Sequence, residues 1–196
     1  MFWPLVLSFA SESGLSRVIS VSGCGMLLGS AIIVRWGGFR PRVFGIIFSI
    51  FLQGICLCLG GFRPSIALAS IGGFGYLFGQ AVIVSSNHTI WQSKVPVNIQ
   101  GRVFALQTLM EKSLLIVAQL STGLLIDGFF EPLMAADGAL ADSVGRIIGV
   151  GEGRGIALVL ILVGIMNVFA ALIAYQIPRL RRVETDIPDA IIGMPS

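Results

Sequence analysis

Two adjacent charged residues, Glu111 and Lys112, lie in a run that is otherwise almost entirely apolar, LQTLMEKSLLIVAQL at residues 106–120. A carboxylate in such a run can exchange a proton or hold a cation, and an ammonium group can pair with an anion. A charged side chain at the centre of a membrane helix costs about 2.5–3.5 kcal/mol on insertion scales. These two charges therefore require polar surroundings.

The positions of the neighbouring polar residues indicate one polar face on a helix. With about 100° between successive residues, the polar side chains fall within an arc of about 100°. This polar stripe consists of Thr108, Glu111, Lys112, Gln119 and Thr122. The opposite face carries Leu106, Met110, Val117, Leu120 and Leu124. Since polar side chains in lipid would be costly, we expect the stripe to face protein or water.

Three interpretations of the charged pair are open. Glu111 can be a carboxylate that couples transport to protons or cations, or that contacts a cationic substrate in a polar cavity. Alternatively, each charge pairs with a neighbouring helix and is structural. In the third interpretation, the span begins after Lys112 and both side chains extend to the membrane surface. That span would hold only about 14 apolar residues, about 21 Å of helix, so the first two interpretations are favoured.

The composition of the whole chain predicts the elements that position this stripe. The chain has 196 residues, of which 55% are hydrophobic and 12% charged, and its mean hydropathy is +0.92. Soluble domains carry about 25% charged residues. The apolar runs are continuous rather than alternating, which excludes the pattern of a transmembrane barrel. We therefore predict an all-α polytopic membrane protein.

The apolar runs predict one partial span and five full ones. The partial span covers residues 1–10, about half a bilayer, and we expect it to be the second half of a helix that begins upstream. The full spans are predicted at residues 16–34, 43–60, 66–85, 103–126 and 156–176, followed by a tail at 183–196. Small residues at helix-packing spacing, Gly25 with Gly29 and Gly75 with Gly79, predict close contacts between spans.

The connections between the spans alternate between rich and poor in basic residues. The rich ones contain Arg35, Arg40 and Arg42, then Lys94 and Arg102, then Arg179, Arg181 and Arg182. The connection at 127–155 contains five acidic residues and two arginines. By the positive-inside rule the rich connections and the C-terminus are cytoplasmic. The net charge of +3 is thus a topology signal, and no nucleic-acid partner is expected.

The connection GSAIIVRWGGFRPRVFG at residues 29–45 resembles the signature loop of the major facilitator superfamily. The matching residues are Gly29, Arg35, Gly37, Gly38, Arg40 and Arg42. The acidic residue usual before the first basic one is absent, because Val34 stands there. Two roles remain open for the arginines: topology anchors, or a latch that changes between conformations.

A second stretch, IWQSKVPVNIQGRVFAL at residues 90–106, resembles the loop before the next-to-last helix in the drug, macrolide and siderophore exporters of this superfamily. The matching residues are Pro96, Gly101 and Arg102, and LIDGFFEPLM at residues 125–134 also resembles that branch. The resemblance extends from Phe2 to about Arg182. It implies that the chain is the C-terminal six-helix half of a twelve-helix transporter, with its first span truncated.

The resemblance also implies a function. Two six-helix halves would surround a central cavity and alternate its access, usually driving proton-coupled export of small amphipathic or cationic molecules. Substrate contacts would then include Glu111, Lys112, Gln119 and Thr108, with Gln80 on a neighbouring span. The expected partners are the lipid bilayer of a bacterial inner membrane, a small-molecule substrate and an N-terminal half. No cofactor or metal is expected.

A different class of function stays open. Alternating access requires a site between two halves, so this chain could instead be a non-transporting remnant or an interaction subunit. Without a second half or a second copy, we expect no transport by this chain alone. An enzyme is not expected, since the sequence has no nucleophile–base arrangement, metal-ligand cluster or nucleotide-binding fingerprint.

Overall fold

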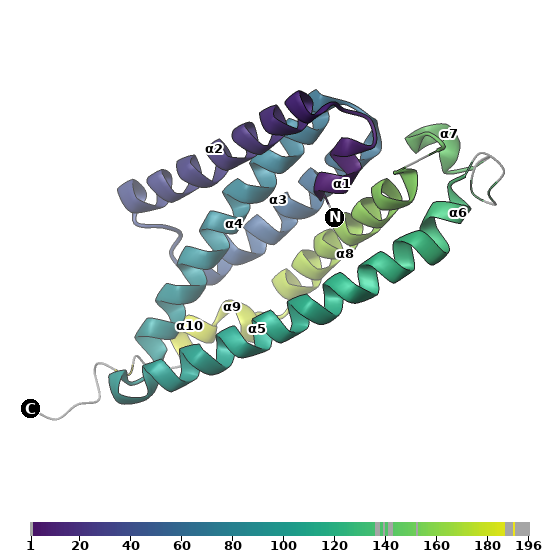
Figure 1. Ribbon diagram of the computed structural model, residues 1–196. Helices are drawn as coiled ribbons and strands as arrows, with labels where there is room; N and C mark the ends of the chain where they lie inside the picture. Colours follow the sequence, from purple (N-terminus) through teal and green to yellow (C-terminus); the bar gives the residue numbers. More distant parts are fainter. Residues whose placement is uncertain are drawn as a thin grey trace, which may run out of the picture.

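The computed structural model describes residues 2–135, 138, 140, 143–151, 153–186 and 190, and every regular element among them is a helix. Five helices are long and apolar enough to cross a membrane (Figure 1). They are α2 (Glu12–Trp36), α3 (Arg42–Phe62), α4 (Ile66–Lys94), α5 (Val97–Leu125) and α8 (Arg154–Gln176). The chain is therefore an all-helical protein with the features of an integral membrane protein.

Shorter helices lie at the ends of these spans. They are α1 (Phe2–Leu7), the π-helix η1 (Ile126–Phe130), α6 (Glu131–Leu133), α7 (Gly145–Ile148), α9 (Pro178–Arg181) and α10 (Val183–Asp186). The partial span predicted at 1–10 is thus a helix of six residues. Of the tail predicted at 183–196, only α10 and Ala190 belong to the described residues.

The five full spans are where the sequence predicts them, but two predicted connections are shorter than expected. Residues 86–94 continue α4, and only Val95 and Pro96 separate α4 from α5. Gly101 and Arg102 consequently lie within α5 rather than in a loop. Proline lacks an N–H and disfavours helical backbone at the residue before it, so the break falls at Val95–Pro96 and not earlier.

The connection predicted at 127–155 begins with further helix. After α5, η1 and α6 continue the helix to Leu133. Asp127 and Glu131, expected in a loop, therefore lie on these helical turns, because an acidic residue does not by itself end a helix. The acidic residues 137, 142 and 152 lie outside the described residues.

Glycines allow α2, α3 and α4 to pack at short range, as the small-residue spacing predicts. A Cβ added at Gly25 of α2 would overlap the main chain at Phe74 of α4, and one at Gly29 would lie 2.9 Å from the carbonyl oxygen of Phe78. A Cβ added at Gly79 would lie 3.1 Å from the Gln53 side chain of α3. Backbone approach of this kind is how membrane helices pack without a hydrophobic driving force.

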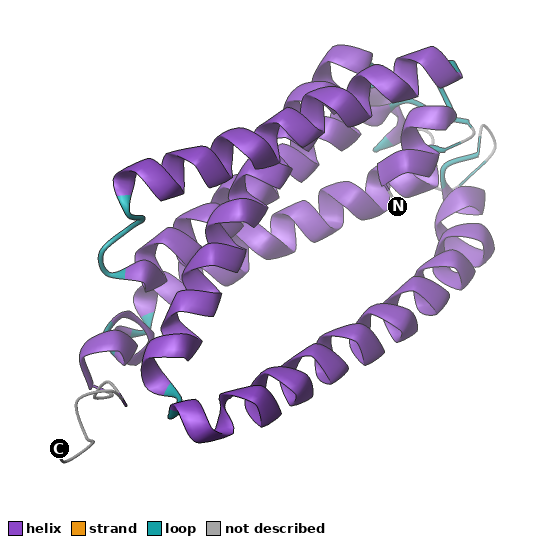
Figure 2. Cartoon of the chain, turned by 60° about the vertical axis from the view of Figure 1, so that its left-hand side comes forward, coloured by secondary structure: helices purple, strands orange, loops and turns teal. Residues whose placement is uncertain are grey.

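The helix α5 stands apart from the other spans. Figure 2 shows α5 joined to the rest of the chain at its two ends, through the connection from α4 and through η1 and α6. No residue of α5 is buried, and Leu120 and Leu124 keep 68% and 78% of their surface exposed. Both the polar stripe and the apolar face of α5 are therefore largely uncovered by the described part of the chain.

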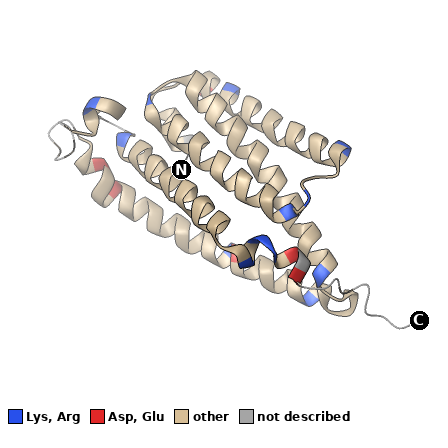
Figure 3. Cartoon of the chain, turned by 180° about the vertical axis from the view of Figure 1, so that it is seen from behind, with Lys and Arg blue, Asp and Glu red and all other residues tan. Residues whose placement is uncertain are grey.

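Apart from Glu111 and Lys112 in the middle of α5, most charged residues gather near the two ends of the helical bundle (Figure 3). The end that carries the α2–α3 and α4–α5 connections also carries α9 and α10, because consecutive spans run in opposite directions. The arginines at 35, 40, 42, 179, 181 and 182 all belong to this end, which we call the basic end. Asp127 and Glu131 lie at the opposite end.

Glu131 caps the N-terminus of α8. Its carboxylate accepts hydrogen bonds from the main-chain N–H groups of Gly153 and Gly155, the latter at 3.0 Å. We expect Glu131→Ala to lower the free energy of unfolding by about 1–3 kcal/mol, because two N–H groups lose a charged acceptor. Thermal unfolding in detergent, followed by circular dichroism, measures this. Asp127→Ala, at an exposed neighbouring position, should have little effect, and equal losses in both variants would contradict the capping role.

Candidate functional site between α4 and α5

A polar pocket of about 420 Å³ lies between α4 and α5. Its α4 wall carries Gln80, Asn87, His88 and Gln92, and its α5 wall carries Gln107, Thr108 and Glu111. The remaining lining residues are Ile83, Val84 and Phe104, whose ring centroid lies 6.1 Å from that of His88. The pocket is in the size range of small-molecule sites, and its lining is more polar than is usual for them.

The pocket extends to the middle of the membrane-spanning helices. Gln80 and Glu111 each lie 14 residues from the α4–α5 connection, counted from Lys94 and Val97, so they occupy the same level of this helical hairpin. Gln80 also contacts Gln53, the twelfth of the 21 residues of α3. A helix of that length spans about 30 Å, the thickness of a hydrocarbon core. Glu111 is therefore far from either end of its helix.

Glu111 is held by a residue of its own helix. The Gln107 Nε2 atom donates to Glu111 Oε1 at 2.9 Å, and the Oε1 atom of Gln107 is buried without a hydrogen-bond partner. No salt bridge joins Glu111 or Lys112 to a neighbouring helix among the described residues. The pocket thus contains a carboxylate and an unsatisfied carbonyl oxygen, which are acceptors for N–H groups and cations.

A buried amide orients the opposite wall. Gln53 of α3, only 6% exposed, donates through Nε2 to Gln80 Oε1 at 3.0 Å and to the Tyr76 carbonyl oxygen at 3.1 Å. The oxygen of the Gln80 amide is therefore engaged, while its nitrogen keeps donor capacity. Gln53 and Gln80 together place a polar group on the α4 wall at the level of Glu111.

The structure brings together only part of the predicted cavity set. Glu111, Thr108 and Gln80 line the pocket. Lys112, Gln119 and Thr122 do not line it. Lys112 is rotated away from α4, and α5 diverges from α4 with distance from the connection that joins them (Figures 1 and 2). These three lie on the uncovered surface of α5, where Lys112 and Gln119 are exposed and Thr122 is partly buried.

The predicted signature loop contains glycines that determine its backbone conformation and arginines that carry its charge. Gly29 of α2 packs against α4, while Gly37 (φ 81°) and Gly38 (φ 77°) adopt left-handed backbone that favours glycine. The N–H of Gly37 bonds to the Ile33 carbonyl oxygen at 2.8 Å and ends α2. Arg35 lies in the last turn of α2, Arg40 in the loop and Arg42 at the first residue of α3. The roles of the three arginines as anchors or latch remain predictions.

The basic end also holds contacts that the sequence did not predict. The Glu184 carboxylate of α10 accepts from the Arg42 main-chain N–H at 2.7 Å, and Lys94 Nζ donates to the Glu184 carbonyl oxygen at 2.7 Å. Pro96 ends the α4–α5 connection, and Gln100 Nε2 donates to the Val95 carbonyl oxygen at 2.9 Å. The segment after α8 therefore contacts the start of α3 and the end of α4 through Glu184.

Four polar residues of the pocket are absent from the predicted set: Asn87, His88, Gln92 and Gln107. The supporting residue Gln53 is also absent from it. The first three fell in the predicted loop, and their helical spacing becomes visible only once α4 is continued to Lys94. Gln107 precedes Glu111 by four residues, the spacing of neighbours on a helix face. Gln53 was detectable as the one strongly polar side chain in its predicted span.

Comparison of the chain with family models, with curated proteins and with solved structures finds no match. The observations that bear on function are therefore the geometry of the α4–α5 pocket and the resemblance of the motifs at residues 29–45 and 90–106 to transporter loops.

Proposed function

We propose that this chain is half of a secondary active transporter and that the α4–α5 pocket forms part of its substrate path. The observation that carries this proposal is the polar pocket of about 420 Å³ at the middle of two spans, with Glu111 on its wall. Ionisable residues inside membrane spans are costly and are typical of substrate, ion or proton paths. A purely structural helix pair would not need such a cavity.

The chemistry of the pocket favours small amphipathic cations as cargo. Glu111 is the only carboxylate among its lining residues, and Lys112 is not part of the lining. Ile83, Val84 and Phe104 supply apolar surface for an aromatic or aliphatic portion of the ligand. A carboxylate beside low-dielectric protein and lipid attracts a cation more strongly than it does in bulk water, even where the site is hydrated. Glu111 is also the group we propose to exchange a proton during export.

Alternating access in this proposal involves a second six-helix half. Five long apolar helices and the motif resemblance support this arrangement, and the uncovered surface of α5 is where we place the contact with that half. The distribution of arginines supports a cytoplasmic basic end and C-terminus. The exporter resemblance supports a bacterial inner membrane. In such a transporter, rocking of the halves would expose the pocket to one side at a time.

A second candidate function is a non-transporting membrane subunit that binds another chain. It is favoured by one observation: no residue of α5 is buried within the described chain. In that case α5 would be an interaction helix and the pocket would be closed by the partner. The two functions differ in whether water and cations reach the pocket.

Cysteine labelling tests access to the pocket. Thr108→Cys places a thiol on the pocket wall, while Met110→Cys, two residues along α5, places it on the apolar face at similar depth. In a background without native cysteines, we expect a membrane-impermeant cationic thiol reagent to modify Thr108→Cys at least tenfold faster, since the reaction requires a hydrated thiolate. An amphipathic cation should slow the reaction at residue 108. Equal rates at both positions would contradict the proposed path.

A further inference from the structure

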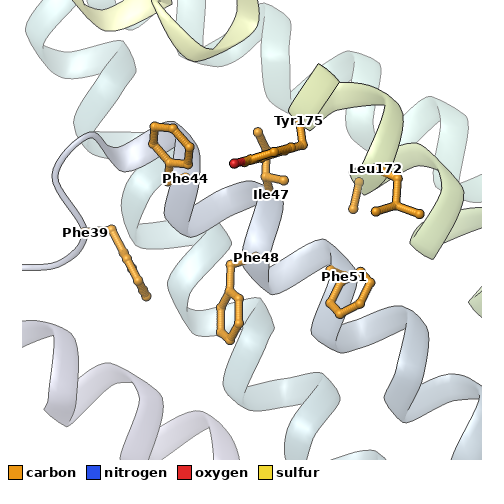
Figure 4. A pocket seen from close by; sticks show the side chains of 8 residues that line it. Phe39, Phe44, Ile47, Phe48, Phe51, Leu172 and Tyr175 are labelled. Atoms are coloured by element: carbon orange, nitrogen blue, oxygen red, sulfur yellow. The ribbon is translucent and has the colours of Figure 1, made fainter. Parts of the chain in front are cut away.

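A second cavity, of about 380 Å³, lies at the basic end between α3 and α8. Figure 4 shows its side chains converging from three segments: Phe39 from the α2–α3 loop, Phe44, Phe48 and Phe51 from α3, and Leu172 and Tyr175 from α8. Its lining is carbon apart from the Tyr175 hydroxyl. This aromatic pocket is separate from the α4–α5 pocket and shares no lining residue with it.

The aromatic pocket opens to the side of the helical bundle. Phe48 and Tyr175 keep 52% and 51% of their surface exposed, so its outer rim faces the surroundings of the two helices. The ring centroids of Phe44 and Tyr175 lie 6.2 Å apart, and those of Phe39 and Phe48 lie 6.1 Å apart. In a membrane-spanning chain, an apolar opening on this side is reached by acyl chains rather than by water.

Cationic groups border the pocket at its polar end. The Arg181 guanidinium carbon lies 5.2 Å from the centre of the Tyr175 ring, and its buried Nε atom has no hydrogen-bond partner. Arg179 is exposed on the same short helix, α9. The acidic side chains of α10, Glu184 and Asp186, are outnumbered by the six arginines of the basic end, and Glu184 already accepts from the Arg42 N–H. The rim of the pocket therefore has an excess of positive charge.

The position of the pocket along the spans matches that of lipid headgroups. Arg42 begins α3 and Gln176 ends α8, so Phe44 and Tyr175 lie within one turn of the helix ends. Aromatic side chains at this level are typical of the membrane–water interface. A ligand that reaches both regions must have an apolar chain on one side and an anionic group on the other.

We propose that the aromatic pocket binds one acyl chain of an anionic phospholipid, with the lipid phosphate against Arg181 and Arg179. The apolar lining takes the chain, and guanidinium groups bind phosphate oxygens through paired N–H donors. A zwitterionic lipid offers the same chain and phosphate, but its cationic headgroup cancels the attraction. The bound acyl chain would contact both Phe39 of the α2–α3 loop and Tyr175 near the end of α8, and so would stabilise their packing.

Native mass spectrometry of the detergent-solubilised chain, titrated with phosphatidylglycerol or phosphatidylcholine, tests this proposal. We expect tighter binding of phosphatidylglycerol, by about fivefold for each arginine engaged. Arg179→Gln with Arg181→Gln should bring the two lipids to equal affinity. Arg63→Gln, an exposed arginine at the opposite end of α3, is the matched control and should keep the preference.

A pocket variant separates the acyl-chain contact from the charge contact. Leu172→Trp, at a rim position that is 46% exposed, should fill the pocket and weaken both lipids several-fold, with the helical circular dichroism unchanged. Equal affinities in the unmodified chain, or a preference that survives the double arginine change, would overturn the proposal. So would a dimer that Leu172→Trp abolishes, because the pocket would then be an interface between copies.

Discussion

Glu111→Gln is expected to weaken the binding of an amphipathic cation by about 10- to 150-fold. A hydrogen bond or close contact to a charged group contributes about 1.5–3 kcal/mol, and glutamine keeps the shape of the side chain while removing its charge. Among the described residues that line the α4–α5 pocket, Glu111 is the only carboxylate, so no other acid in this lining replaces it. Equilibrium titration of the purified protein with a fluorescent cation such as ethidium measures the change in Kd.

The same substitution at another glutamate is the control for this result. Glu12→Gln removes an exposed carboxylate from the first turn of α2, outside both pockets. It should leave Kd within about twofold, as expected for an exposed charge in high dielectric. Membrane insertion and thermal stability of Glu111→Gln should be unchanged, because the Gln107 amide can still bond to the new side chain. An unaltered Kd would remove Glu111 from the proposed path.

Gly25→Ala is expected to be among the most destabilising single-methyl substitutions in the chain. The added Cβ would overlap the main chain of α4 at Phe74, which cannot move aside as a flexible side chain can. Overpacking of this kind costs about 1–3 kcal/mol, since α2 and α4 must separate along their contact. Thermal or denaturant unfolding in detergent, followed by helical circular dichroism, measures the loss.

Gly23→Ala provides a matched control on the same helix. A Cβ at residue 23 meets nothing within 4 Å, so the methyl group enters open space. Alanine should then stabilise α2 by about 0.5–1 kcal/mol through its higher helix propensity. Opposite signs for two glycines two residues apart are the expected result. Similar effects at both positions would mean that α2 does not pack on α4 through this face.

The sequence predicts the spans well because each depends on local composition. Continuous apolar runs and glycine spacing placed all five long helices and the contacts of Gly25, Gly29 and Gly79. The ends of the helices were less predictable. Asn87, His88 and Gln92 are polar, which suggested a loop, but only Pro96 actually interrupts the helical backbone. Polarity indicates where a helix leaves the membrane, and it does not indicate where the helix ends.

The two pockets depend on contacts that no local pattern specifies. Of the predicted cavity residues, Thr108 and Glu111 line the α5 wall of the polar pocket and Gln80 lines its α4 wall. The predicted polar stripe also includes Lys112, Gln119 and Thr122, which do not line the pocket. A helical wheel gives the direction of each side chain, and it does not show at which levels a neighbouring helix lies close. The aromatic pocket joins Phe39 with Tyr175, which are distant in the sequence, and its existence follows only from the packing of α8 on α3.

Proton-driven uptake of ethidium into inverted membrane vesicles tests the central claim most directly, because export from the cytoplasmic face carries substrate into the lumen of such vesicles. The vesicles would come from source cells that carry this coding region at its own locus, and from matched cells in which it is deleted. We predict that ethidium moves against its gradient only when the chain is present and a proton gradient is maintained, and that Glu111→Gln abolishes this movement. Gradient-driven uptake of equal rate with and without the chain, or with Glu111→Gln, would contradict the transporter account.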